Sequence, residues 1–284
     1  MALNPFIPTN VPPYSPQNGE IDFMRRCINL RMGFLMVGPT GSGKTHAINW
    51  LAQNMARPIV TFQGHEGVTQ DHVFGSRGIF EQNGVSVTRF IEGLVPLAMK
   101  MDEGAILYLD EPQLISPGIL ACFHSLMDHR KSICIPEDNN RVVEAKPGFV
   151  VVGAMNEGAG YGGFSLDHAF RDRFGPCIEF NYLAEEKEID LIVARSDISA
   201  ENAGFLVKIA GKLRKAFADK TNDVRTPCST RSLLDCALLV KSGMDMIDAV
   251  KYSIVGKVPS HKIAERQAFY GFCEAVLGQK VIGE

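Results

Sequence analysis

The segment GPTGSGKT at residues 38–45 constrains the fold of this chain more than any other feature of its sequence. It matches the pattern G-x-x-x-x-G-K-[ST] at every fixed position, and it lies between the apolar run 33–38 and a helical segment at 44–56. Glycines let backbone N–H groups surround a phosphate without a clash from Cβ, and the helix N-terminus adds partial positive charge. The pattern therefore predicts a nucleotide-binding loop between a buried strand and a helix.

Individual residues of this loop have distinct expected roles. Lys44 is expected to reach the β- and γ-phosphates, and Thr45 to bind Mg²⁺. A glycine-rich turn that merely closes a strand would not need the complete pattern. The residues predicted to bind nucleotide are Gly38, Pro39, Thr40, Gly41, Ser42, Gly43, Lys44, Thr45 and His46, together with Asp110.

Two acidic residues end another strand-sized run, GAILYLDEP at 104–112. Carboxylates at the end of a buried strand are costly unless they serve a cation or a water molecule. Asp110 suits the magnesium shell together with Thr45, and Glu111 can orient or deprotonate the attacking water. A plain nucleotide binder does not need this glutamate, so Glu111 favours hydrolysis over binding alone.

The order of predicted elements indicates two domains. After an extended, proline-containing arm at 1–19, strands and helices alternate through 20–183, and only helical periodicity follows in 184–284. This pattern predicts an α/β domain with a parallel sheet, followed by a small all-helical domain. The predicted strands are 33–38, 58–64, 104–112, 148–157 and 177–183, and the predicted rear helices are 184–195, 200–219, 229–242, 246–257 and 260–277.

Two hairpins are predicted within the α/β domain. The segment 78–90 carries Asn83-Gly84 between two β-prone runs, which is a strong hairpin signal. The segment 132–145 is the second, with its turn near residues 137–140. We also expect one helix over 115–130, from its spacing of apolar residues.

Composition excludes several classes of protein. The chain is 45% hydrophobic and 21% charged, as expected for a globular chain with a buried core, and it lacks an apolar run long enough to span a membrane. The net charge of −3 argues against a dedicated nucleic-acid coat. The seven cysteines show no metal-binding spacing and indicate a reducing, cytoplasmic location.

The motifs follow one another in the order of a known family. GPTGSGKT, LYLDEP, VVGAMNE and LDHAFRDRF are followed by STRSLLDCALLV. With these motifs the chain resembles the AAA+ ATPases, specifically the MoxR-like group that includes the CbbQ/NorQ-type activases and the gas-vesicle ATPases. The resemblance spans roughly residues 20–245 and implies a P-loop NTPase (AAA+) domain followed by a helical lid. The two hairpins occupy the places of the helix-2 insert and the pre-sensor-1 hairpin of MoxR-like proteins.

The resemblance also implies roles for four further residues. Asn156 corresponds to sensor 1, which positions the attacking water, and Arg231 corresponds to sensor 2. Arg173 resembles the arginine finger that reaches the γ-phosphate of a neighbouring subunit, and Arg171 is a second candidate for that role. On the sequence alone, both arginines could instead pair with Asp167 or Asp172. In the wider group that this chain resembles, some members use GTP and carry Met-Asn followed closely by Asp-Arg. Here Met155-Asn156 is followed by EGAGYGG, which favours ATP.

The resemblance implies a Mg²⁺-dependent ATPase that forms a homo-oligomer, a hexameric ring, in which the finger completes the neighbour's site. Such a ring acts as a chaperone that remodels or activates a client protein, with a von Willebrand A-domain protein as adaptor. Two other functions remain open at this point: a nucleic-acid motor or phage-type packaging ATPase, and a regulatory nucleotide switch.

Overall fold

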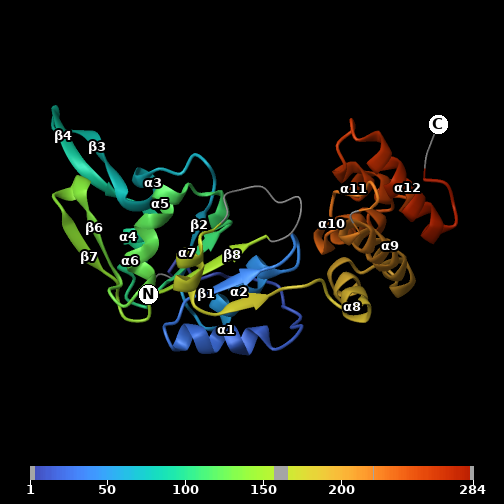
Figure 1. The fold of residues 1–284 in the computed structure, drawn as a ribbon, viewed down its shortest axis with the longest axis horizontal. Coiled ribbons are helices and arrows are strands. Elements are labelled where there is room, and N and C mark those ends of the chain that lie inside the picture. The colour runs from blue at the N-terminus through green and yellow to red at the C-terminus, as the bar shows by residue number, and fades with distance from the viewer. Residues whose placement is uncertain (1–3, 157–165, 220, 282–284) are drawn as a thin grey trace. The chain divides into compact units, whose positions relative to one another are not determined.

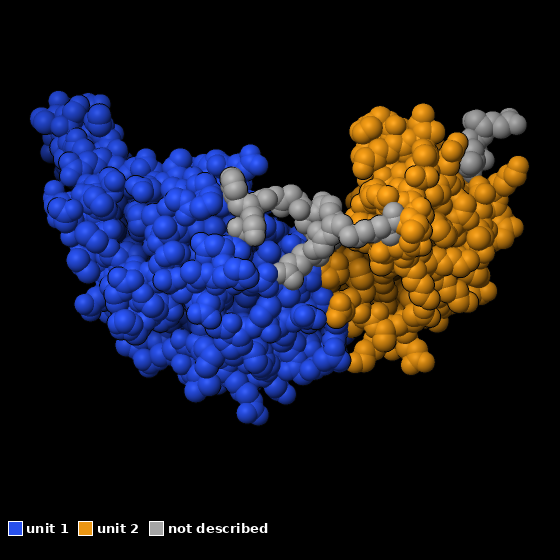
Figure 2. Space-filling model, in the orientation of Figure 1, with its two compact units in different colours: residues 1–38, 43–157, 161–180 blue, residues 39–42, 158–160, 181–284 orange. Residues whose placement is uncertain are grey.

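The computed structural model describes residues 4–156, 166–219 and 221–281. These residues form two compact units (Figure 2). The first unit holds residues 4–38, 43–156 and 166–180, and the second holds 181–219 and 221–281 together with residues 39–42 of the phosphate loop. No helix among the described residues combines the length and the apolar character needed to cross a membrane.

A five-stranded parallel sheet forms the centre of the first unit (Figure 1). Its order is β2-β5-β8-β1-β9, and each neighbouring pair is parallel. Parallel strands that are covered on both faces read as continuous apolar runs, which is how β1, β5 and β8 stand out in the sequence. The strands are β1 (Phe34–Val37), β2 (Ile59–Gln63), β5 (Ile106–Asp110), β8 (Val150–Met155) and β9 (Cys177–Glu179).

Alternate residues of each strand enter two different cores. Phe34 and Met36 of β1 join the core shared with α1 (Glu20–Asn29) and α2 (Lys44–Asn54). Leu35 points the other way, into the core on the opposite face. This division follows from the two-residue period of a strand. Helices of that second face are α3 (Gln70–Phe74), α4 (Leu94–Met99), α5 (Pro117–Leu120), α6 (His124–Met127) and α7 (His168–Phe174).

The helix expected over 115–130 is shorter and divided. α5 begins after Ser116, a 3₁₀ turn covers Ala121–Phe123, and α6 ends before Asp128, whose ψ of −172° is extended. Bonding from i to i+3 tightens the chain between the two α-helical turns, which shifts the buried face relative to a continuous helix. α1, α3 and α4 were not predicted. α3 and α4 are too short to give a helical period, whereas α1 has one, in Ile21, Met24, Cys27 and Ile28, that was overlooked.

Two antiparallel hairpins extend from this unit and lie side by side (Figure 1). β3 (Gly75–Gln82) and β4 (Val85–Glu92) are joined by Asn83-Gly84, whose φ values of 54° and 75° fit a type I′ turn. β6 (Ser132–Ile135) pairs with β7 (Arg141–Glu144).

Two arginines join the hairpins to one another. Arg77 of β3 donates to the carbonyl of Glu137 at 2.8 Å, and Arg141 of β7 donates to Glu92 of β4 at 2.8 Å. The base of the β3–β4 hairpin is therefore held by polar contacts to the turn end of the β6–β7 hairpin.

The N-terminal arm, residues 4–19, contains no helix or strand and packs against the first unit. The carbonyl of Phe6 accepts the N–H of Ile59 at 2.9 Å, and the N–H of Val11 donates to Gln53 of α2 at 2.7 Å. Tyr14 packs its ring edge to face with His46, with centroids 5.5 Å apart. The arm therefore lies along α2, the helix that follows the phosphate loop.

The second unit is helical and has its own core. Its α-helices are α8 (Glu185–Ser196), α9 (Ala200–Ala218), α10 (Thr230–Lys241), α11 (Met246–Ser253) and α12 (Ile263–Leu277). Ser199, Ser229 and Asp245 each cap a helix by accepting a backbone N–H. The parallel sheet and the helical unit confirm the fold class predicted from the sequence.

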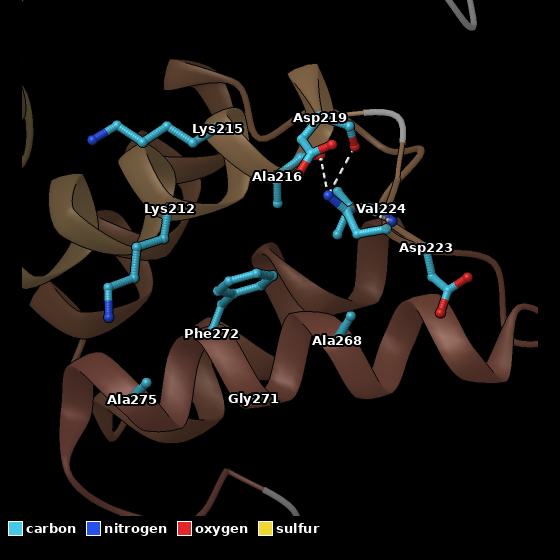
Figure 3. Close-up of a pocket in the computed structure, with 11 residues that line it drawn as sticks. Lys212, Lys215, Ala216, Asp219, Asp223, Val224, Ala268, Gly271, Phe272 and Ala275 are labelled. Atoms are coloured by element: carbon cyan, nitrogen blue, oxygen red, sulfur yellow. Dashed lines mark hydrogen bonds between the residues drawn. The ribbon is translucent and has the colours of Figure 1, made fainter.

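A groove of about 890 Å³ lies on this unit between the end of α9, residues 219 and 222–224, and α12 (Figure 3). Ala216, Val224 and Phe272 give it an apolar lining, and lysine and aspartate side chains also border it. None of the residues that the sequence predicts to bind nucleotide is among the described residues that line it.

Candidate nucleotide-binding site

The phosphate loop adopts a conformation that depends on its glycines. Gly38, Gly41 and Gly43 have φ values of 152°, 70° and 95°, in the region that favours glycine. A Cβ on Gly38 would lie 2.2 Å from the carbonyl oxygen of Phe180, so a side chain has no room there. The loop leads directly into α2, whose N-terminus begins at Lys44. The backbone is thus arranged as the sequence pattern requires for binding an anion.

Lys44 lies at the centre of the site and is only 7% exposed. Its Nζ donates to the carbonyl of Gly38 at 2.9 Å and to Oδ1 of Asn156 at 2.9 Å. Burial lowers the pKa of Lys44 to about 8, against the opposing charges of Glu111 and Asp110. A partly desolvated ammonium group of this kind is well suited to bind phosphate oxygens.

Neighbouring strand ends position the acidic pair. The N–H of Glu111 donates to the carbonyl of Ala154 in β8 at 2.8 Å, and the N–H of Gly64 donates to the carbonyl of Asp110 at 2.7 Å. Glu111 has a φ of 53°, a left-handed conformation that costs a residue other than glycine about 1–3 kcal/mol. This backbone turn directs Glu111 away from the path of the strand.

Asn156 joins the lysine to the glutamate. Its Oδ1 accepts from Lys44, and its Nδ2 donates to Oε1 of Glu111. Gln113 donates from Nε2 to Oε2 of the same carboxylate. The backbone N–H of Asn156 also donates to Oε2 at 3.4 Å, so donors on both oxygens fix the orientation of the carboxylate.

Tyr108 joins the two residues predicted to bind magnesium. Its hydroxyl lies 3.0 Å from Oγ1 of Thr45 and donates to Oδ1 of Asp110 at 3.1 Å. Burial, with the charge of Asp110, raises the pKa of Tyr108, so the phenol stays neutral and remains a donor. Mg²⁺ commonly takes one or two protein oxygens and completes its shell with phosphates and water, and Thr45 and Asp110 fit that pattern.

Hydrogen bonds to backbone groups also order other residues of the phosphate loop. The N–H of Ser42 donates to the carbonyl of Pro39 at 3.4 Å, and the carbonyl of Thr40 accepts from Tyr182 at 3.0 Å. Oγ of Ser42 is buried without a hydrogen-bond partner among the described residues, which fits a loop built to receive a ligand. His46 lies against the arm, where its Nε2 is 2.8 Å from the carbonyl of Pro12.

Two helices carry the three predicted arginines. Arg173 of α7 is exposed, and its Nη1 donates to the carbonyl of Ala169 one turn earlier at 2.8 Å. Arg171 of the same helix is half-buried, and Arg231 is exposed in the first turn of α10. The carboxylate of Asp167 caps α7 by accepting the N–H of Phe170 at 2.6 Å.

Comparisons with known proteins identify the family. Residues 33–174 match the model of the AAA domain (dynein-related subfamily), and residues 188–269 match that of the CbbQ/NirQ/NorQ C-terminal domain. The chain belongs to the MoxR-like AAA+ ATPases. It is 28% identical to "Protein NorQ" of Paracoccus denitrificans over 246 residues, which is 87% of each chain. It is 27% identical to "Protein CbbQ" of Hydrogenophilus thermoluteolus, over 89% of this chain and 90% of that protein.

A solved structure supports the fold. A mutant of RuvB from Thermotoga maritima aligns with a TM-score of 0.52 at 15% identity, over 96% of this chain and 86% of that one. The matches to the two family models confirm the resemblance to the MoxR-like group inferred from the motifs. The prediction of ATP over GTP rests on residues 157–163, which lie outside the described residues of this AAA+ protein.

Three residues that lie against the acidic pair of this AAA+ site were not predicted from the sequence motifs. Gly64 is needed because a Cβ there would lie 2.2 Å from the carbonyl oxygen of Glu111. Tyr108 was assigned only to a buried strand, and Gln113 was not singled out. Tyr108 and Gln113 could have been noticed as polar residues close to Asp110 and Glu111 in the sequence, a signal that Gly64 does not share.

Proposed function

We propose that this protein hydrolyses ATP with Mg²⁺ in a ring of identical subunits, a hexamer, and uses the cycle to remodel or activate a client protein. The observation that carries the proposal is the connection from Lys44 through Asn156 to Glu111. It joins a phosphate-binding cation to a carboxylate that can accept a proton, as hydrolysis requires. Membership of the MoxR-like group supports both the ring and the client.

The side chains divide the reaction between them. Lys44 binds the phosphate oxygens, and Glu111, oriented by Asn156 and Gln113, holds the attacking water and accepts its proton. Attack forms a bond from the water oxygen to the γ-phosphorus and breaks the bond to the oxygen that bridges the β- and γ-phosphates. Mg²⁺, held by Thr45 and Asp110, supplies positive charge to the phosphate oxygens when bound.

Residues outside this network complete the proposed cycle. Arg173, or Arg171, reaches the γ-phosphate bound by the next subunit, and Arg231 senses it from the helical lid. The client is a protein, joined by a von Willebrand A-domain adaptor. The name of one relative, "Denitrification regulatory protein NirQ" of Pseudomonas aeruginosa, agrees with action on a partner.

Replacing Lys44 with alanine tests the binding step. We expect Lys44→Ala to weaken ATP binding by about 10–100-fold, because a charge-assisted hydrogen bond to phosphate is lost. Titration with ATP, followed by calorimetry, measures the effect. Lys208→Ala, which removes an exposed lysine of α9, serves as the control and should leave the affinity unchanged. Equal affinities of the two variants would contradict the assignment of Lys44.

The β3–β4 hairpin is proposed as a client or adaptor contact. Phe80, Val85 and Ile91 are 44%, 62% and 50% exposed, and the strand register puts them on one face. Exposed apolar side chains on a projecting hairpin are typical of interaction surfaces. Lys and Arg do not dominate the hairpin, which argues against a nucleic-acid track.

Shortening this hairpin tests that role. Replacing residues 81–86 with a two-residue turn should leave the melting temperature and the basal ATPase rate nearly unchanged, because these residues are outside the core. Proteins captured by an ATP-loaded Glu111→Gln bait should be lost. Phe80→Ser should reproduce the loss, whereas Thr88→Ser on the opposite face should not. A collapse of thermal stability on shortening would make the hairpin structural.

A further inference from the structure

A buried ion pair joins two helices of the second unit. Nη1 and Nη2 of Arg214 in α9 donate to the two carboxylate oxygens of Glu188 in α8, at 2.7 and 2.8 Å. The two side chains are 15% and 1% exposed. A buried pair is weak evidence for stability, because desolvation offsets much of the attraction. The role of this ion pair is therefore better judged from the groups that it contacts than from its contribution to stability.

Those contacts reach the N-terminus of α10. Nε of Arg214 donates to the carbonyl of Cys228 at 2.9 Å, and the hydroxyl of Thr230 donates to Oε1 of Glu188 at 2.6 Å. Cys228 and Thr230 flank Ser229, the cap residue of α10. The ion pair therefore fixes the first turn of this helix.

The same guanidinium contacts Tyr182. Its central carbon lies 3.7 Å from the centroid of the tyrosine ring, which is a close cation–π contact. The hydroxyl of Tyr182 donates to the carbonyl of Thr40 at 3.0 Å. All of these residues, Thr40 included, belong to the second unit.

Thr40 is part of the phosphate loop, so the direction of its carbonyl matters. A trans peptide is planar and its N–H points away from its C=O, so fixing the Thr40 carbonyl also fixes the Gly41 N–H. The backbone of Gly41 also approaches α10, since a Cβ there would lie 2.6 Å from Cβ of Ser229. Two independent contacts therefore join this peptide to the region that the ion pair orders.

We propose that Tyr182 is a positioning residue for the phosphate loop, held in place by Arg214 and Glu188. By fixing the peptide between Thr40 and Gly41, Tyr182 aims a backbone donor at the bound phosphates. The inference rests on the proposed function only in requiring that nucleotide binds. Because the loop N–H groups serve phosphates that ATP and ADP share, the effect is the same for both nucleotides.

Tyr182→Phe is the test, because it removes one hydroxyl and keeps the ring over Arg214. In the Glu111→Gln background, with Mg²⁺ present, we expect the dissociation constants for ATP and ADP to rise by the same factor, about two- to tenfold. The melting temperature should stay within about 2 °C. Tyr252→Phe, at an exposed tyrosine of α11, should change neither affinity.

Arg231→Ala provides the contrast, since a residue that senses the γ-phosphate should weaken ATP binding and leave ADP binding unchanged. Unchanged affinities in Tyr182→Phe, or weakening for ATP alone, would overturn the positioning role. A smaller fraction of binding-competent protein at unchanged affinity would also overturn it and would make the contact structural. If the parent protein bound no nucleotide, the proposed function would fail, and this inference with it.

Discussion

Arg173→Ala should slow ATP hydrolysis by about 10³–10⁵-fold, the contribution of arginine fingers in related phosphoryl transfer. The variant should still bind ATP and form the ring. Arg173 is exposed on α7, and its one hydrogen bond among the described residues is to Ala169 on its own helix. An exposed guanidinium fits the proposed contact with a neighbouring subunit.

Mixing subunits distinguishes a finger acting across the interface from one acting within its own chain. Arg173→Ala and Lys44→Ala subunits are each expected to be inactive alone. At a mixed interface, the Lys44→Ala chain supplies Arg173 to the intact phosphate loop of the other chain. Activity should therefore return as subunits exchange, and steady-state hydrolysis measures it.

Arg171→Ala, placed two residues earlier on the same helix, identifies the principal finger. It should retain most of the activity if Arg173 has that role. Subunit exchange demonstrated by fluorescence transfer without any return of activity would show that Arg173 acts within its own chain or only stabilises α7.

Glu111→Gln should lower kcat by about 10²–10⁴-fold, the usual contribution of a general base, with little change in ATP affinity. Glutamine keeps the shape of the side chain but cannot accept the proton of the attacking water. Single-turnover hydrolysis and a separate ATP titration measure the two quantities. Glu81→Gln, at an exposed position of the β3–β4 hairpin, is the control and should be unaffected.

Full turnover by Glu111→Gln would remove Glu111 from the chemistry and leave its contacts with Asn156 and Gln113 as structural. The variant also has a practical use, since a subunit that holds ATP without hydrolysis should retain the client and adaptor. Its captured proteins therefore bear directly on the proposed remodelling function.

The local parts of this site were predictable from sequence, because short-range rules determine them. Gly38, Gly41 and Gly43 adopt positive φ values that few other residues tolerate, and the helix after them begins at Lys44. The central strands β1, β5 and β8 were visible as apolar runs because both of their faces are buried. The short helices α3 and α4 span too few residues to show a helical period, and so they were missed, whereas α1 was overlooked although its buried residues do follow one.

The contacts that connect these parts were decided only by the tertiary structure. Asn156 is 112 positions from Lys44 and 45 from Glu111, and the hydroxyl of Tyr108 joins Thr45 to Asp110. Such pairs depend on which strands are neighbours and on their register, which a local pattern does not encode. The sequence by itself determined the residue types that bind phosphate, and the order and register of the sheet decided which of them meet.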